Sequence, residues 1–194
     1  MRHLHFGKLF FVVFSLLLAY TVSARKPIKT LLITGQNNHN WQVSHVVLKQ
    51  ILENSGRFDV DFVISPEQGK DMSGFVLDFS PYQLVVLDYN GDSWPEETNR
   101  RFLEYVQNGG GVVIYHAADN AFSKWPEFNK ICALGGWEGR NENSGPYVYW
   151  KDGKLVKDSS AGPGGSHGRQ HEYVLNGRDK VHPVVKGLPL KWRH

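Results

Sequence analysis

Polar and aromatic side chains follow three apolar segments of the chain, and their types suit the recognition of a sugar. The groups are Gln36, His39 and Trp41 after residues 30–34, Asp88 and Asn90 after residues 84–87, and His116, Asp119 and Asn120 after residues 112–115. Amides and carboxylates hydrogen-bond to hydroxyl groups, and aromatic rings cover the C–H face of a sugar ring. Because such residues are also ordinary in turns, loop formation alone is the alternative interpretation.

His116 ends the apolar segment Val112–Tyr115. An imidazole ordinarily titrates near neutral pH, so it suits proton transfer or metal ligation. A histidine that merely ends a strand is the alternative.

His167 and His171 are candidates for a divalent metal ion such as zinc. On a helix this spacing would place both rings on one face, whereas in an extended chain it spans about 13 Å, too far for one ion. The glycines of residues 162–168 argue against a helix. A zinc site stays open as an alternative, and the sequence implies no cofactor firmly.

Other site chemistries lack their sequence signals. There is no P-loop or G-x-G-x-x-G fingerprint for phosphate, and no G-x-S-x-G or G-x-C-x-G turn for a nucleophile. Cys132, the one cysteine, lies in an apolar helical context that favours a buried role, and it cannot form an internal disulfide.

Residues 1–24 are typical of a secretory signal peptide. Arg2 and Lys8 precede the apolar run Leu9–Tyr20, which is shorter than the roughly 20 residues of a membrane-spanning helix, and Val22-Ser23-Ala24 suits cleavage. We expect an exported protein, periplasmic or extracellular, without a stable membrane anchor. These residues hold two of the 22 basic residues and none of the 19 acidic ones, so residues 25–194 have a net charge of +1. That balance argues against a nucleic-acid partner.

The elements that must position these residues alternate between strands and helices. Strands are predicted at residues 30–34, 58–65, 84–87 and 112–115. A helix with Val43, Val47, Leu48, Ile51 and Leu52 on its buried face ends before Gly56, and a second begins with a capping box at Ser93 and Glu96 and runs to Asn108. This order predicts an α/β fold with a mostly parallel sheet covered on both faces.

The pattern is weaker beyond residue 120. We expect a short helix over residues 125–134, a hairpin of residues 147–150 and 154–156 turning at Asp152-Gly153, and a last strand over residues 172–175.

Five segments together resemble the trehalose-utilisation (ThuA-like) family. They are ITGQNNHNW (33–41), GGGVVIYHAADNAF (109–122), GGW (135–137), HGRQHEYVL (167–175) and HPVVKGLPLKW (182–192). The resemblance covers residues 29–194. It implies the class I glutamine amidotransferase-like superfamily, with a flavodoxin-like three-layer sandwich over residues 25–194. Family members continue past a motif like GLPLKWRH, which implies either a product truncated at its carboxyl end or an incomplete sequence.

The resemblance implies a role in the catabolism of trehalose, another disaccharide or a keto-sugar. The amidotransferases of this superfamily carry their catalytic cysteine on the turn where this chain has His116, so we expect no glutamine amidotransferase activity. His116 would act as general acid or base with Asp119 in an isomerase, lyase or glycoside hydrolase. The substrate-binding candidates are Gln36, His39, Trp41, Asp88, Asn90, Asn120, Trp125 and Trp137. A non-catalytic sugar-binding module and a metal-dependent hydrolase are the alternatives, and the oligomeric state stays open.

Overall fold

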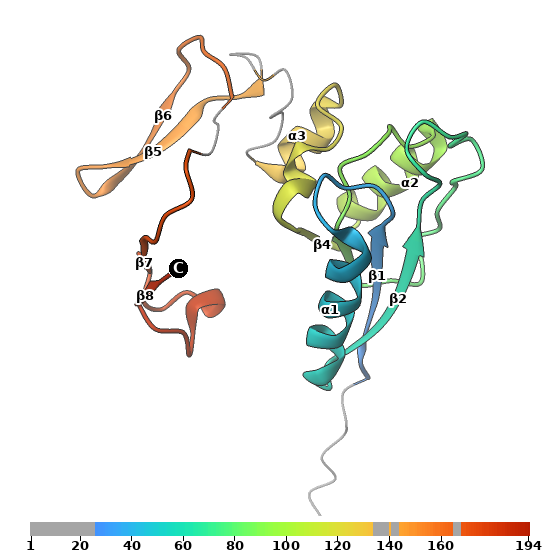
Figure 1. Ribbon diagram of the computed structural model, residues 1–194, viewed down its shortest axis with the longest axis horizontal. Coiled ribbons are helices and arrows are strands. Elements are labelled where there is room, and N and C mark those ends of the chain that lie inside the picture. Colours follow the sequence, from blue (N-terminus) through green and yellow to red (C-terminus); the bar gives the residue numbers. More distant parts are fainter. Residues whose placement is uncertain (1–25, 134–139, 141–143, 165–167) are drawn as a thin grey trace, which may run out of the picture.

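The computed structural model describes residues 26–133, 140, 144–164 and 168–194. Its centre is a four-stranded sheet in the order β2-β1-β3-β4, with every neighbouring pair parallel (Figure 1). The strands are β1 (Ile28–Thr34), β2 (Phe58–Ile64), β3 (Leu84–Leu87) and β4 (Gly111–Ile114). This topology confirms the predicted α/β class.

Two apolar clusters cover the two faces of the sheet and give the molecule three layers. On one face, Leu32 and Val86 pack against Leu48 of α1 (Trp41–Asn54). On the other face, side chains of β1 and β3 pack against Phe102 of α2 (Glu96–Gln107) and Phe128 of α3 (Pro126–Cys132). Burying each such side chain stabilises the fold by about 2 kcal/mol. The predicted three-layer sandwich is therefore present.

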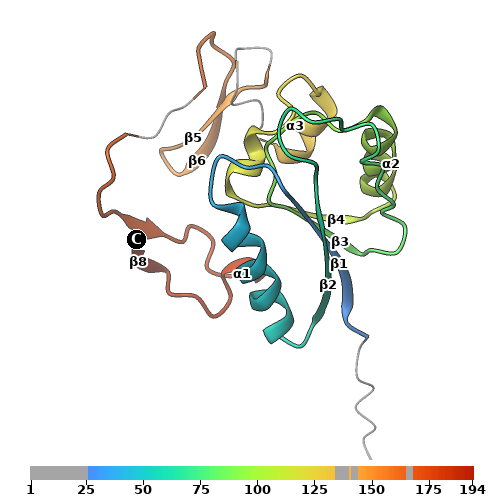
Figure 2. The same ribbon diagram turned by 45° about the vertical axis from the view of Figure 1, so that its right-hand side comes forward.

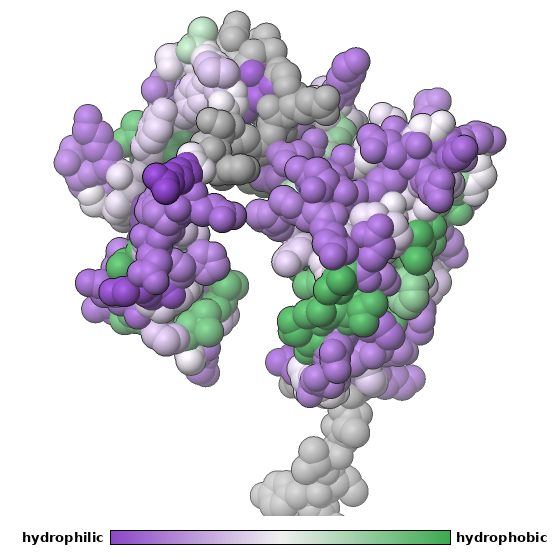
Figure 3. All heavy atoms as spheres, viewed as in Figure 1, coloured by the Kyte–Doolittle hydropathy of each residue, from purple (hydrophilic) through white to green (hydrophobic). Residues whose placement is uncertain are grey.

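Helix α1 buries a narrower face than its sequence predicts. Leu48 and Leu52 pack on the sheet, but Val43, Val47 and Ile51 are 54%, 44% and 62% exposed. The apolar stripe extends around the helix beyond the side that contacts β1 and β2. Figure 3 shows the resulting apolar surface over α1.

The predicted capping box at the start of α2 is wrong. Pro95 is the residue before the helix, and no side chain caps it. Proline is suited to this place because it lacks the N–H that a helix start leaves unpaired. Glu96 and Glu97 fill the first turn, where their charges favour the helix dipole. The helix ends at Gln107, one residue before the predicted end.

Residues 144–164 and 168–194 form two small antiparallel sheets that lie apart from the parallel one (Figures 1 and 2). The predicted hairpin is confirmed as β5 (Tyr147–Lys151) and β6 (Lys154–Asp158), joined at Asp152 and Gly153, which both have positive φ. The predicted last strand is shifted to β7 (Val174–Asn176), paired with β8 (Lys191–Arg193). The short helix η3 (Pro183–Val185) lies between them.

The predicted signal peptide, residues 1–24, lies outside the described residues. Within the described part of the chain, no helix is long and apolar enough to span a membrane.

Candidate functional site

The carboxyl ends of β1, β3 and β4 bring the three polar groups to one edge of the sheet. These strands are neighbours, and their pairing continues past their ends. The Asp88 amide donates to the Ile33 carbonyl at 2.9 Å, and the Tyr115 amide donates to the Leu87 carbonyl at 3.0 Å. Ligands of open parallel sheets bind at this edge.

His116 occupies a sharp turn between β4 and the short helix η1 (His116–Asn120). Its φ is +47°, a left-handed backbone conformation that is uncommon outside glycine. Ala117 and Ala118 follow it and are buried, so small side chains let the turn pack against the core. Such backbone conformations persist only where the surrounding structure holds them in place, and they cluster at functional sites. The turn therefore presents the exposed His116 imidazole at the sheet edge.

A pocket of about 210 Å³ lies beside this turn, and we call it the rim pocket. Its lining residues are Asn37, His39, Asn40, Ser44, Asp88, Tyr115 and His116. The imidazoles of His39 and His116 stack with their centroids 4.5 Å apart and their planes 20° apart. Two groups that can each exchange a proton thus lie together at one pocket.

Asp88 links the loops that form the rim pocket. Its side chain is 1% exposed, and burial raises the pKa of its carboxyl above the ordinary value. The Ser44 hydroxyl of α1 donates to one carboxyl oxygen at 2.5 Å, and the Asn37 amide donates to the other at 3.0 Å. These bonds fix Asn37 and the first turn of α1 against the end of β3, so Asp88 positions the pocket wall.

Gln36 and Asn90 brace the same loops from behind. The Gln36 side chain is buried, donates to the Pro66 carbonyl at 2.8 Å and accepts from the Asp92 amide at 2.7 Å. Asn90 accepts from the backbone amide of Asn38 at 3.1 Å and donates to its side chain at 2.9 Å. Neither residue lines the rim pocket, so the structure gives both a supporting place behind it.

Asp119 and Asn120 lie in η1 with His116, half-buried, and neither lines the rim pocket.

Burial, and after it the charge of Asp119, raises the pKa of the Cys132 thiol to about 12. A thiolate nucleophile is therefore disfavoured near neutral pH.

The candidate tryptophans are dispersed. Trp41 begins α1 with its ring 5.8 Å from that of His45, and Trp125 packs into an aromatic cluster with Phe102 and Phe128. Trp137 lies outside the described residues.

Of the two metal-ligand candidates, the structure describes only His171. His167 lies outside the described residues, while His171 is exposed, with its Nδ1 atom 2.9 Å from the Arg169 carbonyl oxygen. In the described part of the chain, no group of three or more His, Cys, Asp or Glu residues could hold a metal ion.

The site candidates named from the sequence omit Asn37, Asn40, Ser44 and Tyr115 of the pocket, although Asn37 and Asn40 lie in the polar segment that follows residues 30–34. Ser44 carried a usable signal, because it lies one residue after Val43 on an amphipathic helix, in the first turn that must approach the strand ends. Tyr115 precedes the histidine and reads as an ordinary strand residue.

The family profile described as ThuA, trehalose utilisation, matches residues 29–194. The chain is similar to the crystal structure of a ThuA-like protein from Parabacteroides merdae ATCC 43184, with 99% identity and a TM-score of 0.83, over 87% of this chain and 61% of that one. A ThuA-like protein from Bacteroides uniformis ATCC 8492 shares the fold at 21% identity and a TM-score of 0.52, over 87% of this chain and 59% of that one. This chain thus spans about three fifths of each solved structure. No protein of curated function matches it.

Proposed function

The chain belongs to the ThuA family, described by trehalose utilisation, and on this premise we propose that its rim pocket binds a sugar and that His116 transfers a proton to or from it. One observation carries the proposal: His116, held in a left-handed turn, stacks on His39 at a pocket with the buried Asp88 in its wall. Asparagine side chains in the same pocket offer both donors and acceptors for hydroxyl groups.

The substrate class is a disaccharide such as trehalose, or its oxidised keto form. A carbonyl makes the neighbouring C–H bond acidic, so an imidazole can remove that proton and return it elsewhere. His39, stacked on His116, is placed to take part in the exchange or to orient the sugar. Isomerisation, elimination and cleavage of a keto-glycoside all need this step, and none of them needs a covalent nucleophile.

Deuterium exchange tests the proposal directly. A 3-keto-glucoside incubated with the protein in D₂O should lose the NMR signal of the proton next to its carbonyl faster than in buffer alone. His116→Ala should return the rate to that of buffer, while the folded state, followed by circular dichroism, stays intact. Equal rates for both proteins would refute the role of His116.

A non-catalytic sugar-binding module is the second candidate. Trp41 favours it, because this half-buried ring begins α1, directly after two residues that line the rim pocket. The module predicts saturable trehalose binding that survives His116→Ala and is lost in Trp41→Ala. The acid–base proposal instead predicts that His116→Ala removes proton exchange.

A metal-dependent hydrolase using His167 and His171 makes a different prediction. It requires stoichiometric zinc in the purified protein and loss of activity in His171→Ala. The acid–base proposal predicts that the exchange rate of His171→Ala equals that of the parent, because His171 does not line the rim pocket.

We also propose that residues 1–24 direct export and are removed, as their composition indicates. Amino-terminal sequencing of the protein recovered from the periplasm or medium should begin at Arg25. An intact Met1 on recovered protein would oppose this.

A further inference from the structure

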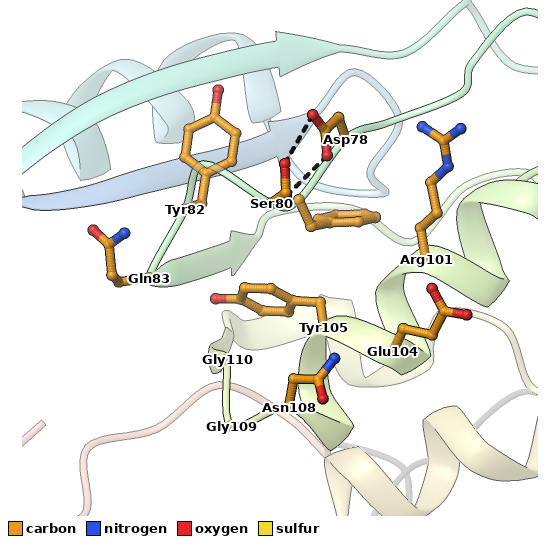
Figure 4. Close-up of a pocket in the computed structure, with 11 residues that line it drawn as sticks. Asp78, Ser80, Tyr82, Gln83, Arg101, Glu104, Tyr105, Asn108, Gly109 and Gly110 are labelled. Atoms are coloured by element: carbon orange, nitrogen blue, oxygen red, sulfur yellow. Dashed lines mark hydrogen bonds between the residues drawn. The ribbon is translucent and has the colours of Figure 1, made fainter.

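A second hollow lies between residues 78–83 and residues 101–110, and we call it the helix-end groove (Figure 4). Residues 78–83 precede β3, and residues 109 and 110 precede β4, so the groove lies at the amino ends of these strands, opposite the rim pocket. Its volume of about 450 Å³ exceeds the 210 Å³ of the rim pocket. Small-molecule sites occupy roughly 300–1,000 Å³, so the groove has the capacity for a ligand.

Two half-buried tyrosines line the groove, and both have their hydroxyls engaged by the protein. Tyr82 donates to the Asp61 carboxylate at 3.1 Å, and Tyr105 donates to the Gly111 carbonyl at 2.9 Å. Phe79, 2% exposed, lies 5.8 Å from Tyr105 between ring centroids. Because the hydroxyls are occupied, the tyrosines contribute mainly ring carbons to the groove, which is the surface that the C–H side of a sugar ring contacts.

Arg101 and Glu104, two charged residues that line the groove, are already paired with neighbours. Arg101 donates from Nε to Glu97 at 2.7 Å, and Glu104 accepts from Arg100 at 2.5 Å. The arginines are the main cause that lowers the pKa of Glu97 to about 2, so this carboxylate stays ionised and keeps its partners. With Arg101 and Glu104 paired in this way, the groove favours an uncharged ligand over an ionic one.

Polar side chains also lie along the edge of the groove, some bonded within the protein and some open to a ligand. The Asp78 carboxylate accepts from the amide and hydroxyl of Ser80 at 2.9 and 3.0 Å, drawn as dashed lines in Figure 4. Asn108 is exposed after the end of α2, and its side chain makes no hydrogen bond to the residues that the structure describes. The Asn108 amide and the Arg101 guanidinium therefore line the groove together with the tyrosine rings. Both groups can form hydrogen bonds to hydroxyls, and they do so in different directions.

We propose that the helix-end groove binds an uncharged sugar ring, with Tyr82 and Tyr105 against its C–H surface and Asn108 and Arg101 bonding to its hydroxyls. The groove would then hold a saccharide away from the reactive rim, as a retention site. The choice of a sugar rests on the proposed function, whereas the uncharged, hydroxylated character of the ligand rests on the groove itself.

An NMR titration of the ¹⁵N-labelled protein with α,α-trehalose tests this proposal. Saturable shifts are expected for the amides of residues 79, 80, 82 and 83 and of residues 104–111. Asn108→Ala should weaken this binding on the order of fivefold, the worth of a hydrogen bond. Gln107→Ala is the matched control, since Gln107 is exposed on the same helix turn but does not line the groove, and its affinity should be unchanged.

The titration separates the two proposals because the rim and the groove have different amides. Shifts near residues 37–40 and 115–117 without shifts at the groove would overturn the groove site alone. Groove shifts without rim shifts, both with trehalose and with a 3-keto-glucoside, would support the groove and contradict the proposed function. Equal affinity of Asn108→Ala and Gln107→Ala for trehalose would overturn the assignment of Asn108 as a ligand-binding residue of the groove.

Discussion

The rim pocket and the helix-end groove lie at opposite ends of the same strands, and they are built in different ways. The rim is made by loops that follow three neighbouring strands, cross-linked through Asp88, and it carries two imidazoles. The groove is made by residues 78–83, which form no helix or strand, and by the end of α2. None of the described residues that line it is a histidine or a cysteine. The rim therefore holds two imidazoles suited to proton transfer, while the tyrosine hydroxyls and the carboxylates of the groove are engaged by hydrogen bonds within the protein.

The difference follows from what each end of a parallel sheet demands of the chain. At the carboxyl end, successive strands release loops toward one another, so that side chains from distant sequence positions meet. At the amino end, the chain enters the strands, and the local pairs of residues 78 with 80 and 101 with 97 already satisfy most charges. Reactive groups are concentrated where loops converge.

Replacing His116 by alanine should have the largest effect and should affect the rim alone. We expect the rate of proton exchange of a keto-sugar to fall by at least about a hundredfold, the usual worth of a general acid or base. Trehalose binding at the groove should be unchanged. A variant that loses groove binding as well would show that the two regions are coupled, and the comparison would fail.

Gly91→Ala should disrupt the rim pocket by displacing Gln36, which braces the loops of the pocket. A Cβ at Gly91 would lie 2.0–2.6 Å from side-chain atoms of Gln36, whose Cβ can move little. We expect a loss of about 2–3 kcal/mol in the free energy of unfolding, the cost of overpacking, measured by urea denaturation. Gly74→Ala is the control, because no atom lies within 4 Å of its added Cβ. Equal stability of the two variants would contradict the bracing role of Gln36.

Gly110→Ala is the corresponding change at the groove, with a smaller expected effect. Its Cβ would lie 2.3–2.5 Å from the ring atoms of Tyr105, which can tilt away. We expect a loss of about 1 kcal/mol in stability together with weaker trehalose shifts at the groove. Proton exchange at the rim should keep the parent rate. A fall in exchange without any change at the groove would reverse the assignment of the two regions.

Asp88→Asn should change the pH dependence of stability more than its magnitude. Burial raises the pKa of Asp88 in the folded protein, so the folded state holds this proton to a higher pH than the unfolded chain does. Its contribution is therefore most favourable below the ordinary pKa, near 4, and declines as the pH rises toward the raised folded value.

Urea unfolding of both proteins from pH 4 upward measures this contribution. The stability of the parent relative to Asp88→Asn should fall with rising pH and then become constant. A difference that does not vary with pH would show that Asp88 titrates alike in the folded and unfolded states.

The parallel sheet could be predicted because its strands are short, continuous apolar runs whose order alternates with helices. The exposed valines of α1 could not, since an apolar stripe does not say how much of it a sheet can cover. The start of α2 differs from its prediction as well, because Ser93 and Glu96 match a capping box but Pro95 itself is the residue before the helix, and no side chain caps it.

The gathering of His39, Asp88 and His116 at one edge could be predicted from the strand ends alone. The left-handed turn at His116 and the burial of Asp88 depend on tertiary packing, which no local pattern contains. The helix-end groove was missed because its residues read as a loop and a solvated helix end, and only the folded chain places them together.

The most direct test of the central assignment is a crystal structure of the protein soaked with a 3-keto-glucoside. We predict a sugar in the rim pocket. A nitrogen of the His116 imidazole should face the C–H next to the carbonyl or bond to the carbonyl oxygen. A ligand that occupies the helix-end groove at full density while the rim stays empty would contradict the assignment of the reactive site to the rim.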